Sequence, residues 1–240
     1  QHRLGLYPEY KKNRSPTPPE LTAQKKMLKA LLEAFGHMCI QMHGVESDDV
    51  LASLAHTYVA QGHEVLIITT DKDLMQLVKD GEVVLARYVD TGEGQPKTHE
   101  FYEEQDVLNK FGVRADQIAD WLALVGDSVD NIPGVDSVGE KTATKLLLEH
   151  GSLSALITNA ASVGGKLGER LRESLPNLPL YRKLSTVLRD VPVECPVPPE
   201  WNEDRNAWAR AVIQAPRFWP HDINSDLRDM PEPSSYRPKM

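Results

Sequence analysis

Acidic side chains gather in three short segments of this chain, and their types and spacing could do chemistry. Segments 44–49 (GVESDD), 70–73 (TDKD) and 126–131 (GDSVDN) together carry seven carboxylates: Glu46, Asp48, Asp49, Asp71, Asp73, Asp127 and Asp130. Each segment alone has an ordinary structural explanation, because acids favour the first turn of a helix and Asp is common in turns. Gathered in one crevice, however, these carboxylates would repel one another unless cations lay among them.

A cluster of carboxylate oxygens is the environment that hard divalent cations prefer. Mg²⁺ keeps several waters in such a site and bridges to a substrate phosphate. Two ions roughly 4 Å apart can clamp the attacking and leaving oxygens of a phosphoryl displacement. The acids therefore predict phosphodiester hydrolysis, provided that the three segments converge.

A second motif, residues 133–142 (PGVDSVGEKT), directly follows the third acidic segment. Its two glycines bracket a tight turn at the start of a helix, where backbone amides and the helix dipole favour an anion. Such a turn could grip one phosphate backbone without reading bases, and its carbonyls could hold a monovalent cation such as K⁺. A plain connector between two helices is the alternative. The residues that would make the grip are Gly134, Val138, Gly139, Lys141 and Thr142.

The charge is distributed unevenly. The 27 Lys and Arg against 35 Asp and Glu give a net charge of −8, which by itself disfavours nucleic acid as a partner. Residues 1–30, however, carry seven basic side chains against two acidic ones, so their charge is +5 and the remainder carries −13. This pattern indicates a basic arm on an acidic body, although a solvated basic helix would look the same.

Composition excludes several classes of protein. With 40% hydrophobic and 26% charged residues and a mean hydropathy of −0.41, the chain is typical of a globular protein and not of collagen or a coiled coil. No apolar run approaches the ~20 residues of a membrane span, so we expect no membrane partner. Cys39 and Cys195 lie far apart without zinc-site spacing, which indicates reduced thiols in a reducing compartment.

The acidic segments fall where an α/β fold places functional groups. The near-continuous apolar run 64–70 (EVLIITT) predicts a central strand buried on both faces of a parallel sheet. A helix capped by Ser47 precedes it, a short helix over 74–79 and a strand over 83–88 follow, and a further strand is predicted over 37–43. This alternation predicts a mostly parallel sheet with flanking helices, in which ligands bind at the carboxyl ends of the strands.

From residue 101 the pattern becomes helical. We expect helices over 103–111, 115–125, 140–150, 153–159, 166–175 and 181–188. The chain thus divides into an α/β core with a basic arch (1–100), a helical subdomain that carries the 133–142 turn (101–192) and a Pro-rich tail (193–240). In the first part a Pro-rich loop leads into a helix that ends at Gly36. The tail is expected to be partly disordered, with Trp201, Trp208 and Trp219 packing some of it on the body.

Four runs at fixed spacing resemble the 5′-3′ exonuclease and flap endonuclease family, in particular the nuclease domain attached to bacterial DNA polymerase I and its stand-alone relatives. These runs are LYPEYKKNR (6–14), GVESDDVLASLA (44–55), LIITTDKDLMQLV (66–78) and ALVGDSVDNIPGVDSVGEKTATKLL (123–147). The resemblance covers about residues 3–192. It implies a PIN-like α/β domain with a helix-three-turn-helix subdomain, which binds branched or nicked duplex DNA and cuts near a 5′ end with two Mg²⁺ or Mn²⁺ ions.

The resemblance also assigns roles to residues. It implies metal-binding acids at Glu46, Asp48, Asp71, Asp73 and Asp130 and supporting acids at Asp49 and Asp127. The basic arch, which would contact the scissile phosphate or the threaded 5′ strand, falls on Tyr10, Lys11 and Arg14. Three residues apart, Lys11 and Arg14 would share a helix face if the arch orders on DNA. The duplex-gripping turn falls on Gly134, Val138, Gly139, Lys141 and Thr142.

The family's first strand ends in a metal-binding aspartate and another metal-binding aspartate follows before the arch, and both would lie upstream of Gln1.

We nevertheless expect a structure-selective, metal-dependent 5′ nuclease of replication or repair, with Lys11 and Arg14 in catalysis. Its substrate would be duplex DNA with a 5′ flap, a nick or a free 5′ end. We expect a monomer in the cytoplasm at the nucleoid, or in an organelle if the source is eukaryotic. The alternatives are a branched-DNA-binding module without catalysis and a PIN-like ribonuclease, which would not need the 133–142 turn.

Overall fold

The computed structural model describes residues 2–34, 37–89 and 98–195. The chain divides into two compact units, the first formed by Gln1–Ser15 with Met42–Cys195 and the second by Pro16–Gln41 with Pro196–Met240. Within its described part the second unit holds helix α2 (Pro19–Ala34), the helix predicted after the Pro-rich loop. Its predicted end at Gly36 lies outside the described residues, as do the three tryptophans of the tail.

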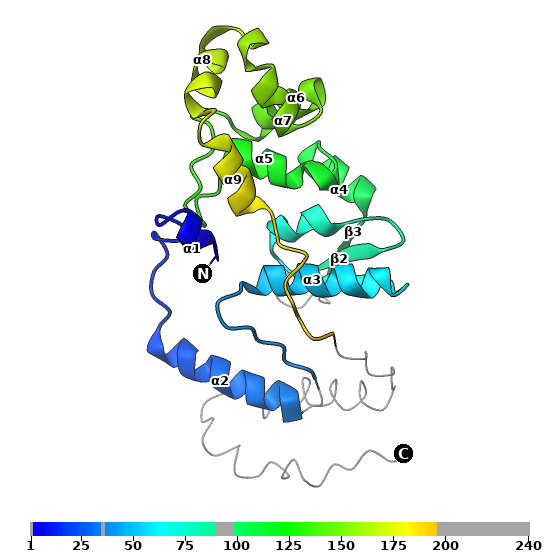
Figure 1. Ribbon diagram of the computed structural model, residues 1–240. Helices are drawn as coiled ribbons and strands as arrows, with labels where there is room; N and C mark the ends of the chain where they lie inside the picture. Colours follow the sequence, from blue (N-terminus) through cyan, green and yellow to red (C-terminus); the bar gives the residue numbers. More distant parts are fainter. Residues whose placement is uncertain (1, 35–36, 90–97, 196–240) are drawn as a thin grey trace. The chain divides into compact units, whose positions relative to one another are not determined.

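A small sheet organises the α/β part of the first unit (Figure 1). Strand β1 (Val65–Ile68) pairs in parallel with β2 (Val83–Val89), with Val65 opposite Val83. Strand β3 (Thr98–Tyr102) pairs with β2 in the antiparallel direction. The crossover between β1 and β2 contains the 3₁₀ helix η1 (Lys72–Leu77), and helix α3 (Ser47–Ala60) packs against both β1 and η1. The predicted α/β class is confirmed. Strand β3 was not predicted from the sequence.

Other local expectations were wrong. Residues 37–43 form no strand: no described strand pairs with them, and Met38 and Ile40 are exposed, so their apolar alternation has no partner to bury it. The N-cap of α3 is Glu46 and not Ser47, whose hydroxyl instead bonds the Asp48 carboxylate. Strand β1 lies at the edge of the described sheet, with Leu66 53% exposed, although its composition predicted burial on both faces.

The helical half agrees closely with its prediction, and α6 has the predicted bounds. Its elements in chain order are α4 (Glu104–Phe111), η2 (Ala115–Gln117), α5 (Ile118–Val125), α6 (Glu140–His150), α7 (Leu153–Thr158), η3 (Ala160–Ser162), α8 (Gly165–Ser174) and α9 (Leu178–Ser185). Helix α5 is buried along most of its length and packs against α6 and α9. It therefore anchors the loop that follows it, residues 126–139, which carries the third acidic segment.

Two terminal segments of the first unit complete the frame. Helix α1 (His2–Leu6) lies at the N-terminus and leads into a turn that carries Tyr10. After α9 the chain runs across α3, where the Ser53 hydroxyl donates to the Leu188 carbonyl (3.2 Å) and accepts from the Val191 amide (3.0 Å). Both segments thus pack against the helix that carries the first acidic segment. A search of the described residues for a helix able to cross a membrane finds none.

Changing Gly134 to Ala should destabilise the protein strongly. Gly134 has φ +69°, and an added Cβ would lie 2.5 Å from the Gly126 nitrogen and 2.6 Å from the Val125 carbonyl carbon. Left-handed strain and the backbone clash together should lower the free energy of unfolding by roughly 2–4 kcal/mol. Denaturant titration would measure this loss.

The matched control is Gly139→Ala in the same turn. A Cβ at Gly139 meets nothing within 4 Å, and its φ is negative. The loss there should be about 1 kcal/mol or less. Equal losses for the two variants would contradict the described packing of this turn on the end of α5.

Candidate functional site

Two of the three acidic segments meet through side chains near the N-terminus. From here on, the N-terminal arm means residues 2–14, which belong to the first unit. The Tyr10 hydroxyl lies 2.8 Å from Asp130 Oδ2 and 3.2 Å from Glu46 Oε2, and Lys11 Nζ lies 2.7 Å from the same Glu46 oxygen. Lys11 also lies 3.6 Å from Asp130, which Arg14 contacts at 2.5 Å. Glu46 and Asp130, 84 positions apart in sequence, therefore share one set of donors.

The backbone holds this arm against the loop after α5. The Lys11 amide donates to the Asp130 carbonyl (3.0 Å), and Asn131 Nδ2 donates to the Glu9 carbonyl (2.6 Å). Lys11 has φ +57°, a left-handed conformation that costs a residue with a side chain about 1–3 kcal/mol and persists only where neighbours enforce it. The position of Lys11 is thus set by the loop and not by local preference.

The second segment follows the carboxyl end of β1 and brings its acids close to those of the other two segments, and "acidic pocket" below means this gathering of the seven acids. Asp71 is the N-cap of η1, and its Oδ1 accepts the Asp73 amide at 2.9 Å. Burial, followed by the charges of Asp71 and Asp127, raises the pKa of Asp73 to about 7. Burial, followed by the charge of Asp71, also raises the pKa of Asp48. The acids of α3, η1 and the 126–131 loop therefore interact electrostatically, as the convergence of the three segments requires.

Asp127 is neutralised by a neighbour from the second segment. Lys72 Nζ lies 2.9 Å from Asp127 Oδ2, while Oδ1 accepts the amides of Val129 (2.7 Å) and Asp130 (3.2 Å). Burial alone would raise the pKa of Asp127, but the hydrogen bond and charge of Lys72, with these amides, lower it below its usual value. Asp127 is thus a loop-forming carboxylate that also links the loop to η1.

Asp49 differs from the other acids because Arg3 occupies both of its carboxylate oxygens. Its side chain is 2% exposed and forms a two-pronged ion pair with Arg3, at 2.6 and 2.8 Å. Both carboxylate oxygens are therefore occupied, which fits a supporting role and not direct contact with a metal.

The fit of a divalent cation can be tested on the remaining acids. In the described part of the chain no three His, Cys, Asp or Glu side chains are arranged so that they could hold a metal ion. Glu46, Asp127 and Asp130 instead contact Lys or Arg side chains. Among the seven acids, one buried side-chain oxygen nevertheless lacks a partner: Asp73 Oδ1 makes no hydrogen bond. An orphaned carboxylate oxygen among further carboxylates is the donor chemistry that a hard cation takes. The residues thus fit such an ion in donor type and charge.

The predicted phosphate-gripping turn precedes α6, and its members have different environments. Lys141 and Gly139 are exposed, and Thr142 is half-buried. Gly134 is buried against the end of α5, so its role is to allow the turn to pack.

Val138 differs from its expectation. Its side chain is 4% exposed, and its amide donates within the turn to the Val135 carbonyl at 3.0 Å. It therefore shapes the turn but has no amide free for a phosphate. The Thr142 amide is also taken, because it donates to the Gly139 carbonyl at 3.0 Å. The N–H groups of Glu140 and Lys141, the first two residues of α6, are therefore the anion-binding feature.

Tyr10 likewise differs from a simple DNA contact. Its side chain is 3% exposed and its hydroxyl lies on the two carboxylates, so it braces the acids from beneath. Burial and the hydrogen bond to Asp130 raise the pKa of Tyr10, which keeps the hydroxyl a donor. Of the three residues assigned to the basic arch, Lys11 and Arg14 are the accessible ones, with 23% and 49% of their side chains exposed.

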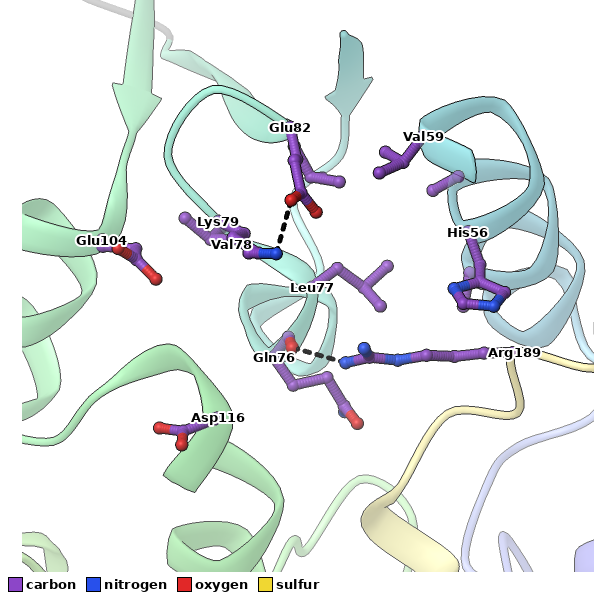
Figure 2. A pocket seen from close by; sticks show the side chains of 13 residues that line it. His56, Val59, Gln76, Leu77, Val78, Lys79, Glu82, Glu104, Asp116 and Arg189 are labelled. Atoms are coloured by element: carbon purple, nitrogen blue, oxygen red, sulfur yellow. Dashed lines mark hydrogen bonds and ion pairs between the residues drawn. The ribbon is translucent and has the colours of Figure 1, made fainter. Parts of the chain in front are cut away.

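A separate cavity of about 170 Å³ lies elsewhere in the first unit, between α3 and the segment 76–83 (Figure 2). Its lining mixes apolar side chains with both signs of charge, and Figure 2 shows Lys79 paired with Glu82 and Arg189 bonded to the Gln76 carbonyl. None of the seven acids lines it. This cavity is therefore distinct from the acidic pocket.

Sequence reasoning missed two basic residues that organise the site, Arg3 and Lys72. Lys72 could have been found, because its place in the Asp-Lys-Asp run puts a cation between two acids. Arg3 carried no such signal: its partners are Asp49 and the carbonyls of Leu184 and Thr186, up to 183 positions away.

Comparisons with known proteins agree with this architecture. Residues 1–112 match the 5′-3′ exonuclease, N-terminal resolvase-like domain, and residues 113–203 match the 5′-3′ exonuclease, C-terminal SAM fold. The chain belongs to the 5′-3′ exonuclease family. Among curated relatives of this exonuclease-family chain, DNA polymerase I of Mycobacterium tuberculosis is 41% identical over 191 residues, which are 80% of this chain and 21% of the relative. The thermostable DNA polymerase I of Thermus thermophilus is 38% identical over 217 residues, 90% of this chain and 25% of the relative.

The chain thus spans between a fifth and a quarter of the length of these relatives. Among solved structures, T5 5′-exonuclease with bound divalent metal ions (zinc) matches with a TM-score of 0.63 at 26% identity, covering 77% of this chain and 69% of the other. A T5 flap endonuclease in a pseudo-enzyme-product complex with DNA and metal ions matches with a TM-score of 0.61. The family expected from the four sequence runs and the α/β fold with its helical second half are confirmed.

Changing Asp73 to Asn should stabilise the metal-free protein, and more so as the pH rises. Because the folded-state pKa of Asp73 is raised to about 7, the folded protein retains a proton that the unfolded chain loses near pH 4. Wild-type stability therefore falls between about pH 4 and pH 7, and Asn removes this loss. Thermal unfolding in EDTA should show a larger gain in melting temperature at pH 8 than at pH 5.

The control is Asp190→Asn, which removes one exposed carboxylate from the same unit. It should shift the melting temperature little at either pH. A gain for Asp73→Asn that is independent of pH, or no gain at all, would show that this carboxyl is not buried among like charges.

Proposed function

We propose that this chain is a metal-dependent 5′ nuclease that hydrolyses DNA phosphodiesters near 5′ ends, flaps or nicks during replication or repair. The observation that carries the proposal is the gathering of acids from three distant segments around Asp73, whose buried Oδ1 has no partner. Repulsion of this kind is relieved by a divalent cation, and the reaction that suits such a cation beside basic groups is phosphoryl transfer. Family membership and the metal-bound T5 relative support this conclusion.

The acids proposed to hold the metal are Glu46, Asp48, Asp71, Asp73 and Asp130. Bound there, Mg²⁺ or Mn²⁺, as two ions, would activate water and neutralise charge on the scissile phosphate. Asp49 and Asp127 act indirectly: the first through Arg3, the second by closing the loop that presents Asp130. Lys72 limits the repulsion by engaging Asp127.

Lys11 and Arg14 are proposed as the groups that receive the scissile phosphate. Each contacts an acid proposed to hold metal and is partly exposed, so each carries its positive charge beside the proposed metal and within reach of solvent. As the pocket acids bind a divalent cation, these side chains can turn to the phosphate oxygens, where a positive charge stabilises the charge that develops in hydrolysis.

The turn before α6 supplies the proposed hold on duplex DNA. Exposed Lys141 and the free amides at the start of α6 would contact one phosphate backbone, a mode that binds without base preference. The T5 relative bound to DNA and metal ions supports a DNA substrate. We further propose a K⁺ at the turn carbonyls, a monomer as the active form, and association with the nucleoid through DNA.

The Asp71→Asn variant should lose cleavage and keep DNA binding. Asn cannot supply the charge that the pocket needs to hold a divalent cation, so single-turnover cleavage of a 5′-flap duplex in Mg²⁺ should fall at least roughly 100-fold. Binding should persist because Lys141 and the α6 amides are untouched. Fluorescence anisotropy on the same substrate would measure binding.

Asp116→Asn, which alters an exposed carboxylate paired with Arg114, is the matched control and should cleave like wild type. Full turnover by Asp71→Asn in magnesium would overturn the metal assignment. Wild-type binding of the flap duplex without cleavage in Mg²⁺ or Mn²⁺ would instead indicate a branched-DNA-binding module. Preferential cleavage of single-stranded RNA would indicate a ribonuclease.

A further inference from the structure

A buried ion pair joins the N-terminal helix to the helix that carries the first acidic segment. Arg3 is 5% exposed and Asp49 is 2% exposed. Arg3 Nη1 and Nη2 donate to Asp49 Oδ2 and Oδ1 at 2.6 and 2.8 Å, a parallel pair of hydrogen bonds that fixes both planes. Arg3 comes from α1 and Asp49 from the first turn of α3, so the pair sets the distance between these two elements.

The remaining donors of Arg3 fix a third segment. Its Nε donates to the Leu184 carbonyl and its Nη2 to the Thr186 carbonyl, both at 2.8 Å, while Asp49 Oδ1 also accepts the Leu188 amide at 2.9 Å. These groups belong to the end of α9 and the chain that follows it. One guanidinium thus connects three stretches of chain far apart in sequence.

Arg3 also lies close to one of the acids proposed to hold metal. Arg3 Nη1 lies 3.7 Å from Glu46 Oε2, the oxygen that also accepts Lys11 and Tyr10. Tyr10, Lys11 and Arg3 therefore all approach the same Glu46 oxygen, and Arg3 also fixes the helix that precedes the other two. Burial alone would lower the pKa of Arg3, but the hydrogen bond and charge of Asp49 raise it, so the group stays charged.

The energetic character of such a pair indicates a geometric role. A buried ion pair gains little net stability over apolar packing, because desolvation offsets the Coulomb attraction. Its fork geometry, in contrast, tolerates no substitute: a lysine offers a single ammonium and cannot bond two carboxylate oxygens and two carbonyls in one plane. What the Arg3–Asp49 pair supplies is thus the register of α1 against α3.

We infer that Arg3 is a positioning residue of the nuclease site, which through Asp49 holds the arm in the register that brings Lys11 onto Glu46 and Asp130. This inference rests on the proposed function but concerns a residue outside the metal and phosphate groups. Lys11 lies eight residues from Arg3, and its left-handed backbone must be held in place by packing. A shift of α1 would move Lys11 away from both acids at once.

The test is Arg3→Lys, followed by two measurements on the full chain. Hydrogen exchange of the backbone amides in residues 7–14 should accelerate by roughly 10-fold or more, because the Lys11 amide loses its fixed acceptor at Asp130. The single-turnover rate of flap cleavage at saturating DNA should fall roughly 10- to 100-fold with the dissociation constant for DNA little changed. In a Lys11→Ala background the further loss on Arg3→Lys should nearly vanish, as expected for two residues that act through one contact.

The matched control is Arg182→Lys, at the ion pair that Arg182 Nε forms with Asp120 Oδ1 (2.5 Å) between α9 and α5. It should leave the exchange of residues 7–14 and the cleavage rate unchanged. This variant separates a local loss of register from a general loss of stability.

Each outcome decides the inference. Unchanged exchange in residues 7–14, or rate losses that add fully in the Lys11→Ala background, would overturn the positioning role and leave Arg3 as a structural residue. If wild type cleaves no substrate, the proposed function fails, but the exchange measurement still decides whether Arg3 holds the arm. If Arg3→Lys fails to fold, Asp49→Asn, which keeps the shape of the carboxylate but not its charge, is measured in the same way.

Discussion

Repulsion among half-buried carboxylates is the constraint on which the rest of this structure depends. Chain geometry creates it: Asp71 follows the end of β1 as the N-cap of η1, Glu46 is the N-cap of α3, and the loop anchored by α5 presents Asp130. At an effective dielectric near 20, two charges 4 Å apart already interact by about 4 kcal/mol. Burial, followed by the charges of Asp71 and Asp127, raises the pKa of Asp73 to about 7, so this residue bears part of the repulsion. The basic residues nearby reduce this repulsion, because each of them pairs with one of the acids.

These pairs fall into two kinds that differ in burial. Arg3 is buried with Asp49, and paired hydrogen bonds join the two, so this pair is a constant part of the fold. Lys11 and Arg14 are partly exposed and lie on acids that the proposed function needs for metal, so these pairs can exchange. Burial thus separates the charges that fix the frame from those that can take part in chemistry, even though all are Lys or Arg beside Asp or Glu.

Sequence alone predicted much of the fold where local signals suffice. Helices such as α6 follow from apolar periodicity and flanking glycines, and the three acidic segments could be placed because strand ends and helix starts are local features. The failures share another cause. The exposure of residues 38 and 40, the ion pair of Asp49 and the burial of Tyr10 depend on which segments, far apart in sequence, lie beside these residues. Strand β3 likewise depends on its pairing with β2. The type of a residue indicated which interactions it can make, but only the fold showed which residue is its partner.

The charge distribution has the same explanation. The +5 of residues 1–30 looks from sequence like a free surface for phosphates, yet in the first unit Arg3, Lys11 and Arg14 are engaged with carboxylates of the body. A side chain cannot give full attraction to a carboxylate and a phosphate together, because each pairing takes the same few donors. Under the proposed function, a metal ion that binds Glu46 and Asp130 would replace Lys11 and Arg14 as their partner. These two side chains would then be available to bind DNA phosphates. Metal and phosphate then favour each other's binding, since both relieve the repulsion that the fold builds into the pocket.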